Sequence, residues 1–135
     1  SGSNKGELRQ AEQAFRQVEA LGDMDGAMNL ARVYFKEGRV GEASQALRRA
    51  TAGDPPAPHW TIAWYTALID RENGHLDEAI HSLESIIDTR FEDARQRGFD
   101  FSKDVRVTNM LGRTLFERAR LERGEARREA REAFL

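Results

Sequence analysis

Few residues in this sequence could support catalysis or metal binding. The chain has three histidines, His59, His75 and His81, and no cysteine. No two histidines are four residues apart, the spacing that places two metal ligands on one helix face. The absence of cysteine excludes thiolate zinc sites, iron–sulfur clusters and cysteine nucleophiles. Because there is also no glycine-rich phosphate loop and no Gly-x-Ser-x-Gly elbow, the sequence predicts no enzyme activity, no metal site and no cofactor.

The paired carboxylates have a structural explanation. Asp23 with Asp25, and Asp77 with Glu78, stand at the starts of predicted helices. Their negative charges there offset the positive end of the helix dipole. We therefore expect these residues to stabilise helices and to take no part in acid–base chemistry.

Chain length and hydropathy limit the possible folds. With 135 residues, the chain is long enough for one domain whose core needs no disulfide or metal. No apolar run approaches the roughly 20 residues of a membrane-spanning helix, so we expect no membrane span. Residues 1–4 are typical of a cloning remnant, because no apolar stretch of a signal peptide follows them.

Charge is distributed unevenly along the chain, although the net charge is only −2. Residues 1–93 carry ten Lys or Arg and sixteen Asp or Glu, whereas residues 94–135 carry eleven and seven. The arginines between 106 and 131 alternate with glutamates, many at i, i+4 spacing, as in Arg118 and Glu122. A nucleic-acid surface would have a stronger positive balance. The segment therefore predicts a salt-bridged helix face and no nucleic-acid partner.

An internal repeat is visible at an offset of 36 residues. The segment 37–43 (EGRVGEA) aligns with 73–79 (NGHLDEA), and Leu47 aligns with Leu83. In each copy a glycine separates two segments whose apolar residues have helical spacing. Glycine tolerates a positive φ, so it allows one helix to end before the next begins. Each copy is therefore predicted to be a helical hairpin.

These residues resemble the tetratricopeptide repeat. The first unit matches that pattern at eight positions: Leu30, Ala31, Tyr34, Gly38, Ala43, Leu47, Ala50 and Pro55. The second unit keeps six: Ala63, Ala67, Gly74, Ala79, Leu83 and Ile86. It departs from the pattern at Thr66, Asp70 and Phe91, which leaves the register of its first helix open by about one residue.

The resemblance implies an all-α fold, a right-handed superhelix of antiparallel helical hairpins with six to seven helices. We expect a leading half-repeat at 5–22, repeats at 24–57 and 60–93, an irregular connector at 94–103, and an incomplete third repeat at 104–135. In the last unit a turn is expected at Gly124, with a second helix from near Glu125.

Residues in the connector are expected to end one helix and begin another. Gly98 should end the preceding helix, and Ser102 with Asp104 should cap the next one. Phe99 and Phe101 are expected to anchor the connector on the neighbouring hairpin.

The resemblance implies a protein–protein interaction module that binds a peptide or partner helix in its concave groove, as a scaffold within a larger bacterial protein. The first helices of successive hairpins would line this groove. The candidate groove residues are Met28, Arg32, Phe35, Lys36, Trp64, Leu68, Arg71, Arg106, Asn109, Arg113 and Phe116. Phe35 and Trp64 could instead belong to the core between helices. Some members clamp a C-terminal carboxylate with a Lys and Asn set. At those positions only Arg32 and Arg106 agree here, whereas Met28, Tyr65 and Met110 do not, so such a clamp is not expected.

Other hypotheses remain open at this stage, among them an enzyme or ligand-binding helical bundle, which would require a closed pocket with convergent polar groups. The chain could form homo-oligomers through uncapped ends, because Phe134 and Leu135 would close an apolar stripe that nothing covers. A narrower resemblance, in 98–104, 109–112 and 115–119, is to the repeat region of bacterial multihaem c-type cytochromes, which would place the parent protein in the periplasm or envelope.

Overall fold

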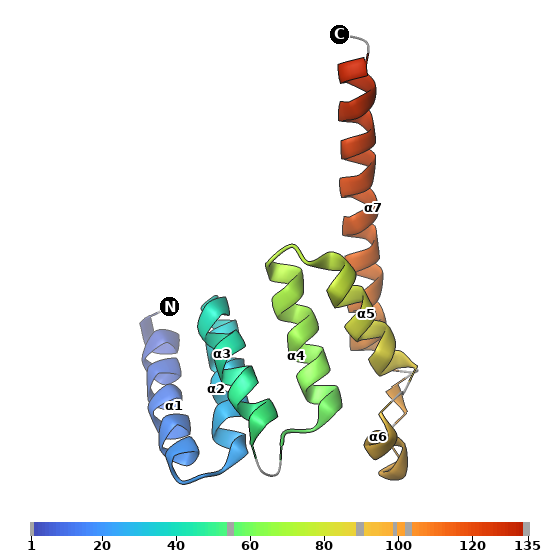
Figure 1. The fold of residues 1–135 in the computed structure, drawn as a ribbon. Coiled ribbons are helices and arrows are strands. Elements are labelled where there is room, and N and C mark those ends of the chain that lie inside the picture. Colours follow the sequence, from blue (N-terminus) through green and yellow to red (C-terminus); the bar gives the residue numbers. More distant parts are fainter. Residues whose placement is uncertain (1, 54–55, 89–90, 99, 102–103, 134–135) are drawn as a thin grey trace.

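The computed structural model describes residues 2–53, 56–88, 91–98, 100–101 and 104–133. Within these ranges the chain forms helices joined by short turns and contains no strand. The helices are α1 (Gly2–Ala20), α2 (Met24–Lys36), α3 (Val40–Ala52), α4 (His59–Glu72), α5 (Leu76–Ile87), α6 (Glu92–Gln96) and α7 (Val105–Ala133). Helices α1 to α5 stand side by side in an array, and α7 passes behind α5 and projects beyond it (Figure 1). The predicted all-α solenoid of helical hairpins is therefore confirmed.

Two hairpins, α2–α3 and α4–α5, close in the same way. Gly38 and Gly74 have φ values of 78° and 80°, in the left-handed region that favours glycine. The Arg39 N–H donates to the Tyr34 carbonyl at 2.8 Å, and the His75 N–H donates to the Asp70 carbonyl at 2.7 Å. These six-to-one bonds satisfy a carbonyl at the end of each first helix, as in a Schellman motif.

The core lies between the helices of each hairpin and continues into its neighbours. The predicted face of α2 is buried, with Leu30 at 1% and Ala31 at 0% exposure. On α3 the alanines Ala43, Ala46 and Ala50 are fully buried. Their small side chains let α2 and α3 approach closely. A second cluster joins α4, α5 and the start of α7: Ala67, Ala79, Leu83, Ile86 and Val107.

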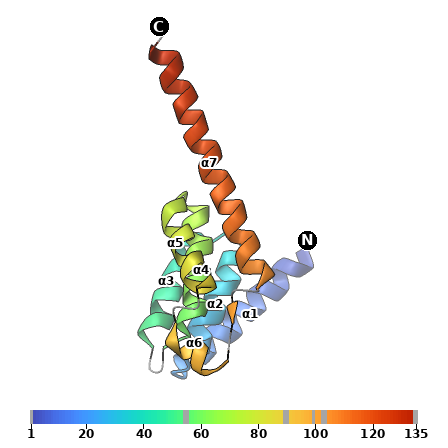
Figure 2. The same ribbon diagram turned by 90° about the vertical axis from the view of Figure 1, so that its right-hand side faces the viewer.

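Helix α7 corrects one expectation, because it is continuous through Gly124. In the described part of the chain the glycines with positive φ are Gly22, Gly38, Gly74 and Gly98. The Arg, Glu, Ala and Leu residues around Gly124 are strong helix formers, and no neighbouring element packs there to require a turn. From Ala119 to Ala133 every residue is exposed, and this half of α7 projects away from the array (Figure 2).

The connector before α7 is partly described. Gly98, with φ of 81°, follows the short helix α6. Asp104 caps α7, since its Oδ1 accepts a hydrogen bond from the Arg106 backbone N–H at 2.9 Å. Pro55, Phe99, Ser102, Phe134 and Leu135, on which some expectations rested, lie outside the described residues. Across the described ranges, no helix combines the length and apolar character needed to cross a membrane.

Candidate partner-binding groove

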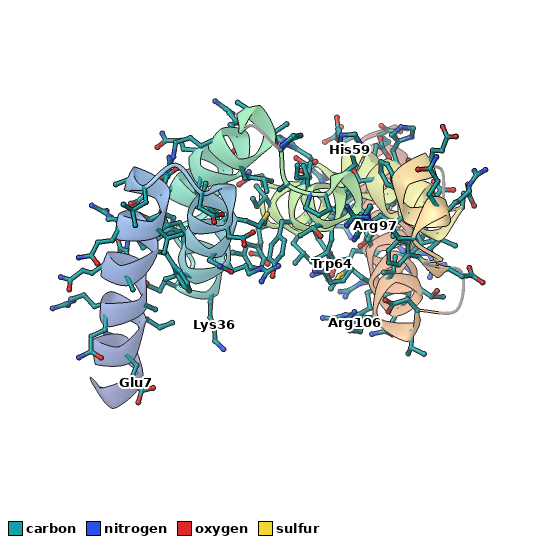
Figure 3. The ribbon with its side chains drawn as sticks, turned by 90° about the horizontal axis from the view of Figure 1, so that it is seen from below. Glu7, Lys36, His59, Trp64, Arg97 and Arg106 are labelled. Carbon is teal, nitrogen blue, oxygen red and sulfur yellow. The ribbon has the colours of Figure 1, made fainter. Side chains whose placement is uncertain are left out.

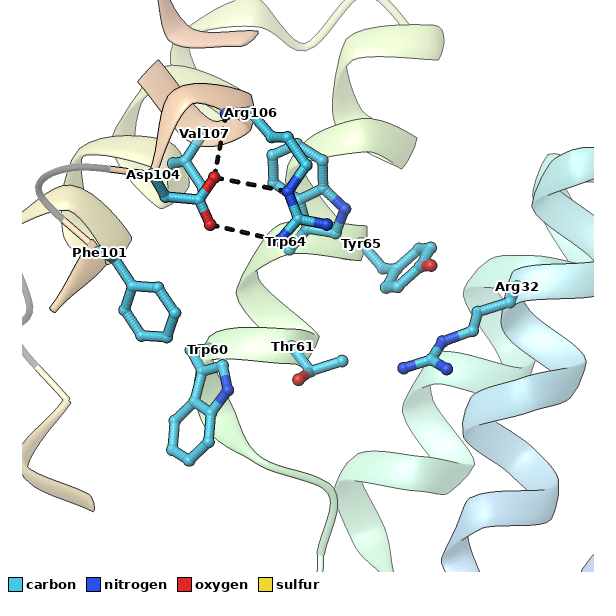
Figure 4. A pocket seen from close by; sticks show the side chains of 9 residues that line it. All are labelled: Arg32, Trp60, Thr61, Trp64, Tyr65, Phe101, Asp104, Arg106 and Val107. Carbon is cyan, nitrogen blue, oxygen red and sulfur yellow. Dashed lines mark hydrogen bonds and ion pairs between the residues drawn. The ribbon is translucent and has the colours of Figure 1, made fainter. Parts of the chain in front are cut away.

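A cavity of about 450 Å³ opens where α2, α4 and the start of α7 meet. We call it the groove. It is lined by Arg32 from α2; Trp60, Thr61, Trp64 and Tyr65 from α4; and Phe101, Asp104, Arg106 and Val107 from the connector and α7. Figure 4 shows these side chains around one open space, with Arg32 and Arg106 entering from different elements.

Aromatic residues of α4 form the floor of the groove. Trp60 and Trp64 are one helical turn apart and lie on one face, and Tyr65 lies beside them. Ala67, one turn after Trp64 on the same face, is buried in the core at 1% exposure, whereas Ile69 is buried at 5% on the opposite face. The face of α4 that lines the groove therefore also contributes to the core. Each of its three groove aromatics is half-buried and keeps surface that a partner can cover.

Contacts from neighbouring elements hold the floor in place. The Phe101 ring lies 6.2 Å from the Trp60 ring, measured between centroids. Phe101 also packs against the second core cluster, as the predicted anchoring role requires. On the other side, Phe35 meets Tyr65 edge-to-face at 6.5 Å. The aromatic floor is thus supported from both α2 and the connector.

Guanidinium groups stand around this floor. The Arg32 guanidinium lies 5.7 Å from the centre of the Tyr65 ring, and its Nη1 donates to Asn29 Oδ1 at 3.2 Å. Arg106 pairs with Asp104, Nη2 to Oδ2 at 3.3 Å. Hydrogen bonds from Arg106 lower the pKa of the Asp104 carboxyl below its ordinary value, so Asp104 is ionised at neutral pH.

The structure brings three of the predicted residues, Arg32, Trp64 and Arg106, together in the groove. In Figure 3, Trp64, Arg97 and Arg106 lie where α4 meets the start of α7, and Lys36 lies apart from them at the end of α2. Phe35 packs against the core around α2 and α3 and reaches the groove only through Tyr65. Trp64 lines the groove and also packs against the second core cluster.

Other predicted residues lie elsewhere. Met28 is 4% exposed in the core, and Leu68 is half-buried on α4. Arg71 forms an ion pair with Glu117 that ties α4 to α7. Three predicted residues of α7 line a shallow hollow of about 660 Å³ along that helix: Asn109, Arg113 and Phe116.

Sequence reasoning missed Trp60 and Phe101 as groove residues. Trp60 stands one turn before Trp64, a spacing that would have placed both on one face once the register of α4 was known. Phe101 was assigned an anchoring role, and no sequence signal shows that the anchor also forms a wall. Within the described ranges, no group of three His, Cys, Asp or Glu side chains is placed to hold a metal ion.

Comparisons with known proteins identify the repeat in one part of the chain. The tetratricopeptide repeat family model matches residues 4–58, which include α1, α2 and α3. No curated protein and no solved structure matched the chain. The similarity of 98–119 to cytochrome-associated repeats stays a prediction. The helical hairpins and the family match agree, and residues 4–58 are tetratricopeptide repeat sequence.

Proposed function

We propose that this chain is a protein–protein interaction module and that the groove between α2, α4 and α7 binds a peptide or partner helix. Tetratricopeptide repeats generally mediate protein–protein interactions or scaffolding. The observation that carries the proposal is the open aromatic floor of α4, flanked by arginines from two other helices. Tryptophan, tyrosine and arginine are the residues most enriched at binding hot spots.

The division of the chain into a half-repeat, two repeats and an incomplete third belongs to this proposal. In that division α2, α4 and α7 are the first helices of successive units, and the groove is the wall that they share. The proposed role is that of a scaffold segment within a larger bacterial protein, without catalytic function.

Site-specific photo-crosslinking tests the proposed function. Thr61 lines the groove between the two tryptophans, and Arg48 lies on α3, outside the groove lining. A benzophenone amino acid at position 61 is expected to crosslink a discrete protein in an extract of the source organism, whereas the same group at position 48 is not. Combining Thr61 labelling with Arg32→Ala and Arg106→Ala should reduce the crosslink while the melting temperature stays within about 4 °C. Equal crosslinking from positions 61 and 48 would place the binding surface outside the groove.

A second candidate function is self-association through α7. Val105, Phe116 and Leu121 of α7 are 78%, 64% and 60% exposed, which is unusual for large apolar side chains on one helix. Sedimentation at several protein concentrations tests this alternative. The variant Phe116→Ser with Leu121→Ser should remain monomeric where the wild type associates, and a wild type that is monomeric at every concentration contradicts it.

A further inference from the structure

The arginines of the groove differ from those that join neighbouring elements of the array. Four such arginines pair with carboxylates of another element: Arg39 with Glu12, Arg49 with Glu19, Arg71 with Glu117, and Arg118 with Asp77. Arg32 forms no ion pair with a described carboxylate, and the amide oxygen of Asn29 is its polar partner. Its guanidinium has five N–H donors, so most of them remain available to a ligand in the groove.

Arg106 on the opposite wall is only partly neutralised. Its contacts with Asp104, Nη2 to Oδ2 at 3.3 Å and Nε to Oδ1 at 3.4 Å, are long for an ionic hydrogen bond. The Arg106 side chain is 84% exposed, so a second carboxylate can reach it. Two guanidinium groups and one carboxylate therefore line the groove of a chain whose net charge is −2.

The aromatic floor is unsuited to a cationic ligand. Aromatic faces attract cations, but here the chain's own arginines already occupy two of these faces. Arg32 lies 5.7 Å from the centre of the Tyr65 ring, and Arg97 lies 5.8 Å from that of Trp60. A lysine or arginine of a partner would meet like charge at both positions. An uncharged apolar side chain meets no such repulsion, and its binding is favoured because it covers the exposed apolar surface of the half-buried tryptophans.

We propose that the groove recognises an extended acidic segment of a partner protein, in which Asp or Glu residues flank one large apolar side chain. The apolar side chain would cover Trp60 and Trp64, and the flanking carboxylates would bind Arg32 on α2 and Arg106 on α7. Because these arginines lie on different walls with the floor between them, acidic residues are needed on both sides of the apolar one. This assignment rests on the proposed function and names the chemistry of its partner.

Intrinsic fluorescence gives a direct readout, because the two tryptophans of the chain both line the groove. The probes are three synthetic nonapeptide mixtures with a central Phe, flanked by random Asp or Glu, by random Asn or Gln, or by random Lys or Arg. The acidic mixture should change the tryptophan emission saturably and bind at least about tenfold more tightly than the amide mixture. Its apparent affinity should fall as the ionic strength rises from about 0.05 to about 0.3 M.

A matched pair of variants assigns the preference to the groove. Arg32→Gln with Arg106→Gln should abolish the difference between the acidic and amide mixtures. Arg127→Gln with Arg128→Gln removes the same charge from the exposed half of α7 and should leave the difference intact. Comparable binding of the amide or basic mixture would overturn the acidic preference but leave a peptide-binding groove. If no mixture changes the emission, the assignment of the ligand is wrong, and the crosslinking from position 61 decides separately whether the groove binds a partner.

Discussion

Gly26 is the position where a single added carbon should disturb this fold most directly. It lies in the first turn of α2, which crosses α1 there. A Cβ at this position would lie 2.3 Å from the Glu19 backbone nitrogen and 2.8 Å from the Phe15 carbonyl oxygen. Both atoms belong to the α1 backbone, so no side-chain rotation relieves the overlap. In Gly26→Ala, α1 must move away from α2 by about 1 Å to restore van der Waals contact.

The size of the effect follows from two opposing terms. Alanine favours a helix over glycine by up to about 1 kcal/mol. Forcing extra volume into a packed contact costs about 1–3 kcal/mol, and more where backbone must move. Displacing α1 also lengthens the hydrogen bonds from Tyr34 and Arg39 to the Glu12 carboxylate, now 3.1 and 3.0 Å. We expect the free energy of unfolding to fall by about 1–2 kcal/mol, which for a chain of this length lowers the melting temperature by about 3–8 °C.

Thermal unfolding followed by circular dichroism measures this loss, and Gly112→Ala is the matched control. Gly112 lies within α7, where a Cβ would meet nothing within 4 Å. The same substitution should therefore raise stability there by about 0.5–1 kcal/mol. The two variants are expected to shift the melting temperature in opposite directions. The reasoning is refuted if Gly26→Ala melts at or above the temperature of the wild type.

Two further predictions concern other contacts. Burial raises the pKa of Glu12, but hydrogen bonds from Arg39, Tyr34 and Arg16 outweigh it and hold the pKa below its ordinary value of 4.5. The stabilisation of the folded state by ionised Glu12 is therefore complete above pH 4.5 and is lost as pH falls through the lowered pKa. The free energies of unfolding of wild type and Glu12→Gln, measured by urea titration, should differ at pH 7 and converge at low pH. A difference that does not change with pH contradicts this. Phe101→Ala removes the ring beside Trp60, so it should shift the tryptophan emission to longer wavelength and lower the free energy of unfolding by about 1–2 kcal/mol. The control Leu121→Ala, at a residue that is 60% exposed, should change neither quantity.

The repeat fold could be predicted from sequence because each hairpin is determined by residues close together in the chain. The spacing of the turn glycines Gly38 and Gly74 and of the buried alanines of α3 indicates directly which helices pack together. Continuity of α7 through Gly124 could not be read in this way. A glycine is compatible with both a turn and a helix, and tertiary packing decides between them. Since nothing packs against that half of α7, the helix continues.

The substitution of Asp70 for the tyrosine of the repeat pattern shows why the register of α4 was difficult to predict. In the first hairpin, the hydroxyl of Tyr34 donates to Glu12 at 3.1 Å, and the Arg39 guanidinium lies 4.5 Å from its ring centre. In the second hairpin, Asp70 occupies the corresponding place, and its carboxylate lies 3.7 Å from His75 Nδ1. Burial raises the pKa of Asp70, and the nearby His75 opposes this shift. Because Asp70 stands at this position, the second hairpin lacks the large aromatic side chain by which the repeat is recognised.

The groove was harder to predict than the fold because one face of α4 contributes to both the core and the groove. A helical period in the sequence identifies a face that avoids water, but it does not say whether another helix or a partner covers that face. Ala67, Trp60 and Trp64 share one side of α4, yet Ala67 is buried in the core whereas Trp60 and Trp64 line the groove. What separates them is size, since small residues let helices of the array approach each other, whereas two tryptophans hold their neighbours apart and leave a space between α4 and α7. The bulky residues that the repeat pattern does not require are thus the ones that form the candidate binding surface.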